Sequence, residues 1–267
     1  MDAQLAVLCS LTFAIHLIGT LAYAVRIAGV RTRRIAVSFA LFNILVLVSR
    51  TSNSFQGPFL AKRIERSLGL GTAESLLGDF RWLLLSATLA TLAGALLIPT
   101  FQRVFSRAVD HFQVHRSLPR LLLHGFFKGG LSQLRDLSQA PSVANLTQLQ
   151  AGRRISVGMI GLNALAVALW TIGVFAALYA GCLNPSLRVT ASSLSSVVNG
   201  VATILMFVVI DPQMSVMTDD VVEGRTTDGQ FRNAVVWLVG SRLAGTLLAQ
   251  ALLVPAALVI SLIARAM

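Results

Sequence analysis

Six long apolar segments leave this chain few ways to fold. Each is long enough for a helix that crosses a hydrocarbon core, which takes about 20 residues. The segments are residues 4–27, 35–60, 80–101, 155–181, 187–210 and 232–264. They are continuous, without the period of two that marks the strands of a membrane barrel. We therefore expect an all-α integral membrane protein with about six transmembrane helices.

The composition agrees with a membrane protein. Apolar residues make up 55% of the 267 residues and charged residues only 12%, whereas soluble domains are about one quarter charged. The net charge is +11, but the basic residues lie in short connections between apolar segments. We therefore expect no nucleic-acid partner. The two cysteines, Cys9 and Cys182, form no CxxC or Cys/His pattern, so neither a disulfide framework nor a zinc site is expected. No other metal cluster and no cofactor is expected either.

The basic residues also predict an orientation in the membrane. The first connection carries Arg26, Arg31, Arg33 and Arg34, and the third connection, residues 102–154, is basic as well. Because basic connections stay in the cytoplasm, both termini are predicted outside. The fifth connection, beyond residue 210, is acidic, and acidic residues contribute little to this rule.

Residues 102–154 are expected to form cytoplasmic helices in the lipid interface. Residues 101–109 are predicted to extend the third transmembrane helix, and residues 117–137 alternate leucines and phenylalanines with basic residues as an amphipathic helix does. Anionic membrane lipids are the expected partners of this segment. A gating or partner-docking role is the alternative.

The single membrane domain, residues 1–267, contains a candidate internal repeat. The third and sixth segments each begin with an acidic residue followed by Phe-Arg, and each contains a Leu-Leu-(Ile/Val)-Pro sequence that ends at Pro99 or Pro255. Repeats over 1–101 and 155–267 would each hold three spans, and therefore opposite topologies. Many transporters are built this way, with their sites near the midplane. Chance similarity between Ala/Leu-rich spans is the alternative.

Three ionisable residues, His16, Arg50 and Arg242, fall well inside their segments. Each costs about 2.5–3.5 kcal/mol to insert, and such residues usually face a polar cavity. We expect no central acidic residue in any span to pair with the arginines. Two unpaired guanidiniums facing one cavity would form an anion site suited to phosphate, whereas a cation pathway would be lined by carboxylates.

Polar residues at helical spacing extend this candidate site. The residues predicted to contact substrate are Arg50, Arg242, Arg26, His16, Asn43, Asn53, Gln56, Asn199 and Gln250. The residues predicted to act in ion coupling or gating are Asp219, Asp220 and Asp211.

Each of these assignments has a structural alternative. The arginines could instead extend outward to the membrane surface or bond to backbone carbonyls, and His16 could be a packed structural residue. Asn199 could join helices, and Asp219 and Asp220 could cap the last helix. No catalytic residue is predicted.

Several of these residues lie in longer segments that are similar to one family. Residues 11–32, 34–38, 42–43, 48–59, 211–221 and 240–246 together resemble the Amj family, the bacterial alternative lipid II flippases. The resemblance covers nearly the whole chain and is weakest over 102–150.

The resemblance implies transport of lipid II, an undecaprenyl-pyrophosphate-linked peptidoglycan precursor, from the inner to the outer leaflet of the cytoplasmic membrane. That transport would serve peptidoglycan synthesis, cell wall biogenesis and cell shape. We expect alternating access through an arginine-lined cavity, without ATP and without enzymatic activity. A homodimer is also considered, because six spans are few for so large a headgroup.

Three other classes of protein remain open from the residues alone. They are a polyprenyl-phosphate-processing membrane enzyme, a small secondary transporter of an anionic solute, and a membrane scaffold that transports nothing.

Overall fold

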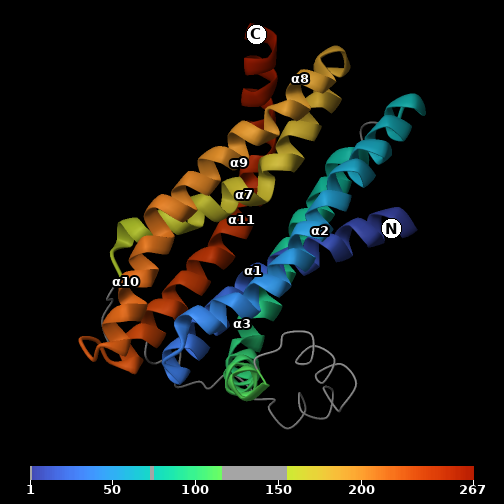
Figure 1. Ribbon diagram of the computed structural model, residues 1–267. Helices are drawn as coiled ribbons and strands as arrows, with labels where there is room; N and C mark the ends of the chain where they lie inside the picture. The colour runs from blue at the N-terminus through green and yellow to red at the C-terminus, as the bar shows by residue number, and fades with distance from the viewer. Residues whose placement is uncertain (1, 73–74, 116–154) are drawn as a thin grey trace.

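The computed structural model describes residues 2–72, 75–115 and 155–267, and this part of the chain is all-α (Figure 1). Six helical spans are long and apolar enough to cross a membrane, as predicted. The elements are α1 (Ala3–Thr32), α2 (Ile35–Gly69), α3 (Leu76–His115), α7 (Val157–Leu183), η3 (Pro185–Leu187), α8 (Arg188–Ser193), α9 (Ser195–Ile204), η4 (Leu205–Ile210), α10 (Asp211–Val222) and α11 (Asp228–Ala266).

The fifth span differs from its prediction. It does not end at residue 210 but runs from Pro185 to Val222 as a chain of short helices. Its middle is the π-helical segment η4, and Pro212 follows in the first turn of α10. Proline fits there because the first turn of a helix leaves its N–H groups unbonded. Most of the predicted acidic connection is therefore helical.

Other helices also continue through internal prolines. Pro58 lies inside α2, Pro99 inside α3, and Pro255 inside α11. The predicted extension over 101–109 is confirmed, because α3 continues to His115. The predicted amphipathic helix over 117–137 lies outside the described residues.

Side chains define where several helices begin. The carboxylate of Asp2 accepts the Leu5 N–H at 2.8 Å and so caps α1. This bond and the Arg63 guanidinium hold the pKa of Asp2 below its ordinary value. Thr227 and Gln230 form a capping box at the start of α11.

The two halves of the chain pack in the same way. In the first half α3 lies along α1, and in the second α11 lies along α7. Each pair contains a glycine where the two helices come close together. A Cβ on Gly94 would lie 2.7 Å from the Thr20 Cβ, and one on Gly245 would lie 2.5 Å from the Ala164 carbonyl oxygen. Small residues allow such close helix packing in membranes.

The core is divided into two apolar clusters, one toward each end of the bundle. The first cluster draws on both halves of the chain and includes Leu5, Leu60, Phe80, Phe175 and Leu253. The second cluster also draws on both halves and includes Tyr23, Phe42, Phe105, Met214 and Phe231. The predicted intramembrane ionisable residues lie along the helices between these two cores.

Both ends of the chain lie at the same end of the bundle. Arg63 contacts Asp2 and, from α2, also Asp79 of α3. Near the other terminus, Arg265 donates to Asn184 at 2.7 Å. The α1–α2 and α10–α11 connections lie at the opposite end (Figure 1). We refer to these as the terminal end and the connection end.

Candidate functional site

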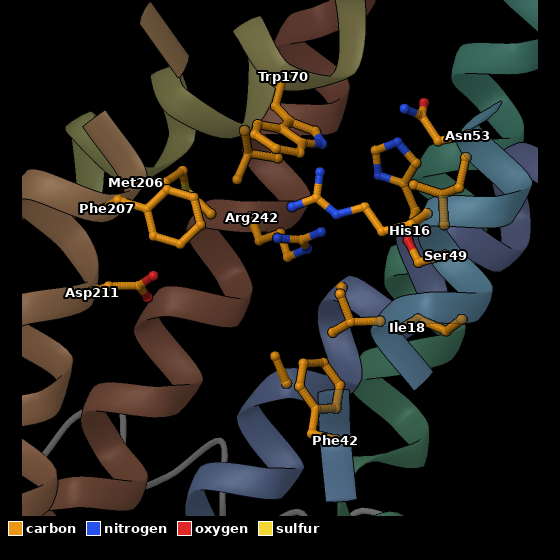
Figure 2. Close-up of a pocket in the computed structure, with 16 residues that line it drawn as sticks. His16, Ile18, Phe42, Ser49, Asn53, Trp170, Met206, Phe207, Asp211 and Arg242 are labelled. Atoms are coloured by element: carbon orange, nitrogen blue, oxygen red, sulfur yellow. The ribbon is translucent and has the colours of Figure 1, made fainter. Parts of the chain in front are cut away.

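A cavity of about 240 Å³ lies between the two halves of the chain. The first half contributes residues of α1 and α2, and the second half contributes residues of α7, η4, α10 and α11. Figure 2 shows the side chains from both halves converging on it. The polar lining residues are His16, Ser49, Arg50, Asn53, Asp211 and Arg242.

Arg242 is buried and is held against α1. Its Nε donates to Thr20 Oγ1 at 3.1 Å. The tip of its guanidinium lies over Gly19, where a Cβ would come within 2.4 Å of Nη2. The position is available because Gly19 has no side chain. This contact lets a residue of α11 reach across to the first half of the chain.

Arg50 and His16 line the same cavity as Arg242. Arg50 is exposed, whereas His16 is only 5% exposed. The Nδ1 atom of His16 is buried and has no hydrogen-bond partner among the described residues. A buried polar atom of this kind has the capacity to bind a ligand.

The charges around the cavity favour an anion. Neither Arg50 nor Arg242 forms an ion pair within the described part of the chain. The expectation that no span holds a central acidic residue was wrong, because Asp211 lines the cavity from inside the fifth span. Its carboxylate is bound by Arg26 at 2.9 Å, so it does not neutralise Arg50 or Arg242.

Arg26 lies beside the cavity rather than in its lining. It is 8% exposed, and its guanidinium lies 5.0 Å from the ring centre of Phe39. Its Nη2 bonds to Asp211, while Nη1 is buried without a partner among the described residues. The ion pair joins α1 to α10, and therefore the first half to the second.

Four predicted contact residues lie away from the cavity. Asn43 is exposed on α2 and is not part of the lining. Gln56 donates to Thr12 and joins α2 to α1. Asn199 lies against Gly173 of α7, and Gln250 exchanges hydrogen bonds with Arg81 of α3. The last three join helices instead of facing the cavity.

The acidic pair of the fifth connection also lies elsewhere. Asp219 and Asp220 are in the last turns of α10 and are not in the cavity lining. Asp220 forms an ion pair with Arg225 at 2.8 Å. Neither residue caps the last helix, because Thr227 does so.

One wall of the cavity was not anticipated from the sequence. Trp170 of α7 and Met206 and Phe207 of η4 face the polar residues across the cavity (Figure 2). The sequence did contain a sign that Trp170 is functional. Tryptophan is typical of the membrane interfaces, whereas Trp170 lies at the middle of its span. The π-helix that carries Met206 and Phe207 has no comparable sequence pattern.

The cavity is exposed on the side between α2 and the fifth span. Arg50 and Asn53 are exposed on α2, and Phe207 is 57% exposed on η4. Apolar residues flank these positions on both sides and are exposed too: Leu47, Val48, Ile204 and Val208. In a membrane such an opening leads sideways into lipid.

The chain is similar to known proteins over most of its length. The family model Amj, described as "Alternate to MurJ", matches residues 11–264. The chain is 38% identical over 251 residues to the lipid II flippase Amj of Bacillus subtilis (strain 168). The aligned residues cover 91% of this chain and 90% of that protein. No solved structure matches the chain. The chain therefore belongs to the Amj family.

Proposed function

We propose that this protein is a lipid II flippase of the bacterial cytoplasmic membrane. Family membership and the name of the Bacillus subtilis relative support this substrate. As a flippase it moves lipid II between leaflets and is a transporter rather than an enzyme. Its activity supplies the precursor for peptidoglycan synthesis outside the membrane.

The observation that carries the mechanism is the meeting of Arg50 and Arg242 in one cavity at mid-bundle. Each is an expensive residue inside a span, and neither has an ion-pair partner among the described residues. A guanidinium presents a planar fork that binds phosphate oxygens bidentately. We assign these two arginines to the pyrophosphate of lipid II.

The neighbouring polar residues extend the binding site. His16 and Asn53 line the cavity, where an imidazole and an amide can bond phosphate or headgroup oxygens. The exposed side between α2 and the fifth span lets the polyprenyl tail remain in lipid while the headgroup enters. This lateral access favours a lipid over a soluble anion as cargo.

The polyprenyl-phosphate enzyme is a weaker explanation of the same site. Such an enzyme needs a general acid/base or metal-binding carboxylates near the phosphate. Among the described residues, Asp211 is the one acidic residue in the cavity lining, and its carboxylate is bound by Arg26. No cluster of acidic, histidine or cysteine residues that could hold a metal is found among the described residues.

An inverted repeat of 1–101 and 155–267 would place this cavity at the interface between repeats. In support, Phe80 and Phe231 are separated by the same number of residues as Gly94 and Gly245. Both phenylalanines are fully buried, and both glycines contact the first helix of their own half. Pro99 and Pro255 are not separated by this interval. The alignment of the two proposed repeats is therefore based on the buried phenylalanines and the glycines, and not on the prolines.

Alternating access would then involve rocking of one half against the other, with a hinge in the fifth span. Before η4 in the chain, Asn199 lies against Gly173 of α7. After η4, Asp211 binds Arg26 of α1. A π-helix followed by proline is a common place for a helix to bend. We assign to this segment the movement of α10 that opens the connection end.

The connection end is assigned to the cytoplasm, where Arg31, Arg33 and Arg34 would meet anionic lipids and gather the anionic headgroup. Moving a negative charge outward is favoured by an inside-negative potential, by about 2.3 kcal/mol per charge per 100 mV. Synthesis of lipid II inside and its use outside add a second driving gradient, so ATP is not needed.

A homodimer stays a prediction.

The test of this function is an outer-leaflet accessibility assay for lipid II in cells whose only lipid II flippase is this protein. With the protein present, externally added enzyme or probe should reach most newly made lipid II. On depletion, lipid II should accumulate in an inaccessible form. Accessibility that is unchanged by depletion would contradict the proposal.

A further inference from the structure

The unanticipated wall of the cavity carries chemistry that an anion site does not use. Trp170 lines the cavity at the centre of α7 and is 37% exposed. Figure 2 shows its indole ring beside the space that Arg242 enters from α11. Among the described residues no arginine or lysine forms a cation–π contact with Trp170; the contact of this kind that is found joins Arg26 to Phe39. Because the indole is partly exposed and lines the cavity, part of its surface is available for a ligand.

The surroundings of this indole are those of a sugar site. Phe207 adds a second exposed ring to the same wall. Asp211 lines the cavity and uses one carboxylate oxygen to bind Arg26, and a carboxylate has about four acceptor positions. A pyranose ring places its polarised C–H groups on the negative face of an aromatic ring, while its hydroxyls donate to nearby oxygens.

The size of the cavity limits how much headgroup it holds. Its volume is about 240 Å³, which is below the roughly 300–1,000 Å³ of sites that enclose drug-sized ligands. A pyrophosphate and one sugar ring approach this volume, whereas a disaccharide with a peptide far exceeds it. The sugar bonded directly to the pyrophosphate is the one that reaches Trp170.

We infer that Trp170 is the stacking platform for the sugar attached to the pyrophosphate, and that recognition of the headgroup ends at this sugar. This inference rests on the proposed function. It defines the substrate class as polyprenyl-pyrophosphate-linked hexoses, whatever sugar or peptide follows. The second sugar and the peptide lie outside the cavity during binding.

Binding of three probe lipids to the purified full-length protein in nanodiscs tests this inference. The probes are undecaprenyl pyrophosphate, undecaprenyl-pyrophosphoryl N-acetylmuramic acid, which carries the first sugar of lipid II alone, and lipid II. The first sugar should tighten binding about tenfold, the order of effect expected for an aromatic contact with an added hydrogen bond. Lipid II should bind within about threefold of the one-sugar lipid.

Variants of Trp170 separate stacking from shape. Trp170→Leu keeps an apolar wall without an aromatic face and should lose the gain from the first sugar. Trp170→Phe keeps an aromatic face and should retain most of it. Trp82→Leu is the matched control, because Trp82 is exposed on α3 and does not line the cavity. It should bind all three lipids as the wild type does.

The outcomes distinguish this inference from the proposed function. Equal weakening of all three lipids by Trp170→Leu, or equal effects of the Leu and Phe variants, would overturn the stacking role. A wild-type preference for lipid II far beyond the one-sugar lipid would overturn the limit at the first sugar. Unchanged binding of undecaprenyl pyrophosphate by Arg242→Ala would instead contradict the arginine site itself.

Discussion

Arg242 lies against the backbone of α1 because Gly19 leaves room for its guanidinium. The bond to Thr20 then fixes the direction of the side chain. Sequence alone indicated that Arg242 and His16 lie on polar faces of their helices, since residues at intervals of three or four share a face. It did not indicate that one glycine positions the arginine, because that contact joins residues far apart in the chain.

Gly19→Ala should therefore impair transport without impairing the fold. Alanine favours a helix by about 0.8–1.0 kcal/mol over glycine, but its Cβ would displace the guanidinium of Arg242. A misplacement of about 1 Å can cost on the order of a hundredfold in activity, so we expect at least a roughly tenfold fall in the rate of lipid II flipping. The rate is measured with purified protein in proteoliposomes.

Gly240→Ala is the matched control for this change. Gly240 lies on α11, close to Arg242, and nothing lies within 4 Å of the position of its Cβ. It should flip lipid II at the wild-type rate. Equal rates for the two variants would show that Gly19 does not position the arginine.

At the scale of the element, the fifth span departs most from its prediction. Asp211 and Pro212 suggested the end of a span, because an acidic residue and a proline usually leave the apolar region. The ion pair with Arg26 makes the carboxylate tolerable there, and a helix can begin again at proline. Hydropathy describes each segment alone and cannot register such partners.

The same limit explains the misplaced amides. Asn199 and Gln250 were assigned to polar stripes and Gln56 to a position beside one, yet all three join helices. Spacing gives the face of a helix but not the neighbour that covers it. The number of spans and the meeting of Arg50 with Arg242 were predictable, because long apolar runs and costly buried charges leave few arrangements.

The Arg26–Asp211 pair should act as a latch between α1 and α10 at the connection end. Asp211→Asn weakens it, so the cavity should open more often from that end. A cysteine introduced by Val46→Cys, with Cys9 and Cys182 replaced by alanine, should then react severalfold faster with a water-soluble thiol reagent in inside-out vesicles. Val46 lines the cavity.

Asp220→Asn serves as the control for the latch. It also removes a carboxylate of α10 that pairs with an arginine, but this pair lies within one half of the chain. The reaction rate of the Val46→Cys position should not change. A similar acceleration by both variants would rule out a specific latch.

For the whole molecule, the two apolar cores close the bundle at its ends and leave a polar layer between them. This arrangement suits a carrier whose site is reached from one side at a time. The six spans found in the described residues are consistent with both termini lying at one end. The basic connections predict that the other end faces the cytoplasm.

Labelling of single cysteines in intact cells checks that orientation. With Cys9 and Cys182 replaced by alanine, Leu70→Cys at the terminal end should react with a membrane-impermeant maleimide. Glu223→Cys at the connection end should react only after the cells are permeabilised. Both residues are exposed, so a reversed pattern would mean that the protein has the opposite orientation.

The central claim is that Arg50 and Arg242 together bind the pyrophosphate of lipid II. The most direct measurement is the rate of lipid II flipping in proteoliposomes by Arg50→Ala and Arg242→Ala, beside the exposed controls Arg66→Ala on α2 and Arg232→Ala on α11. We predict loss of at least about 90% of the rate in the first pair, by removal of interactions on the order of 1.4 kcal/mol or more, little rescue by lysine, and wild-type rates in the controls. Wild-type flipping by either Arg50→Ala or Arg242→Ala, with the protein correctly inserted, would contradict the account.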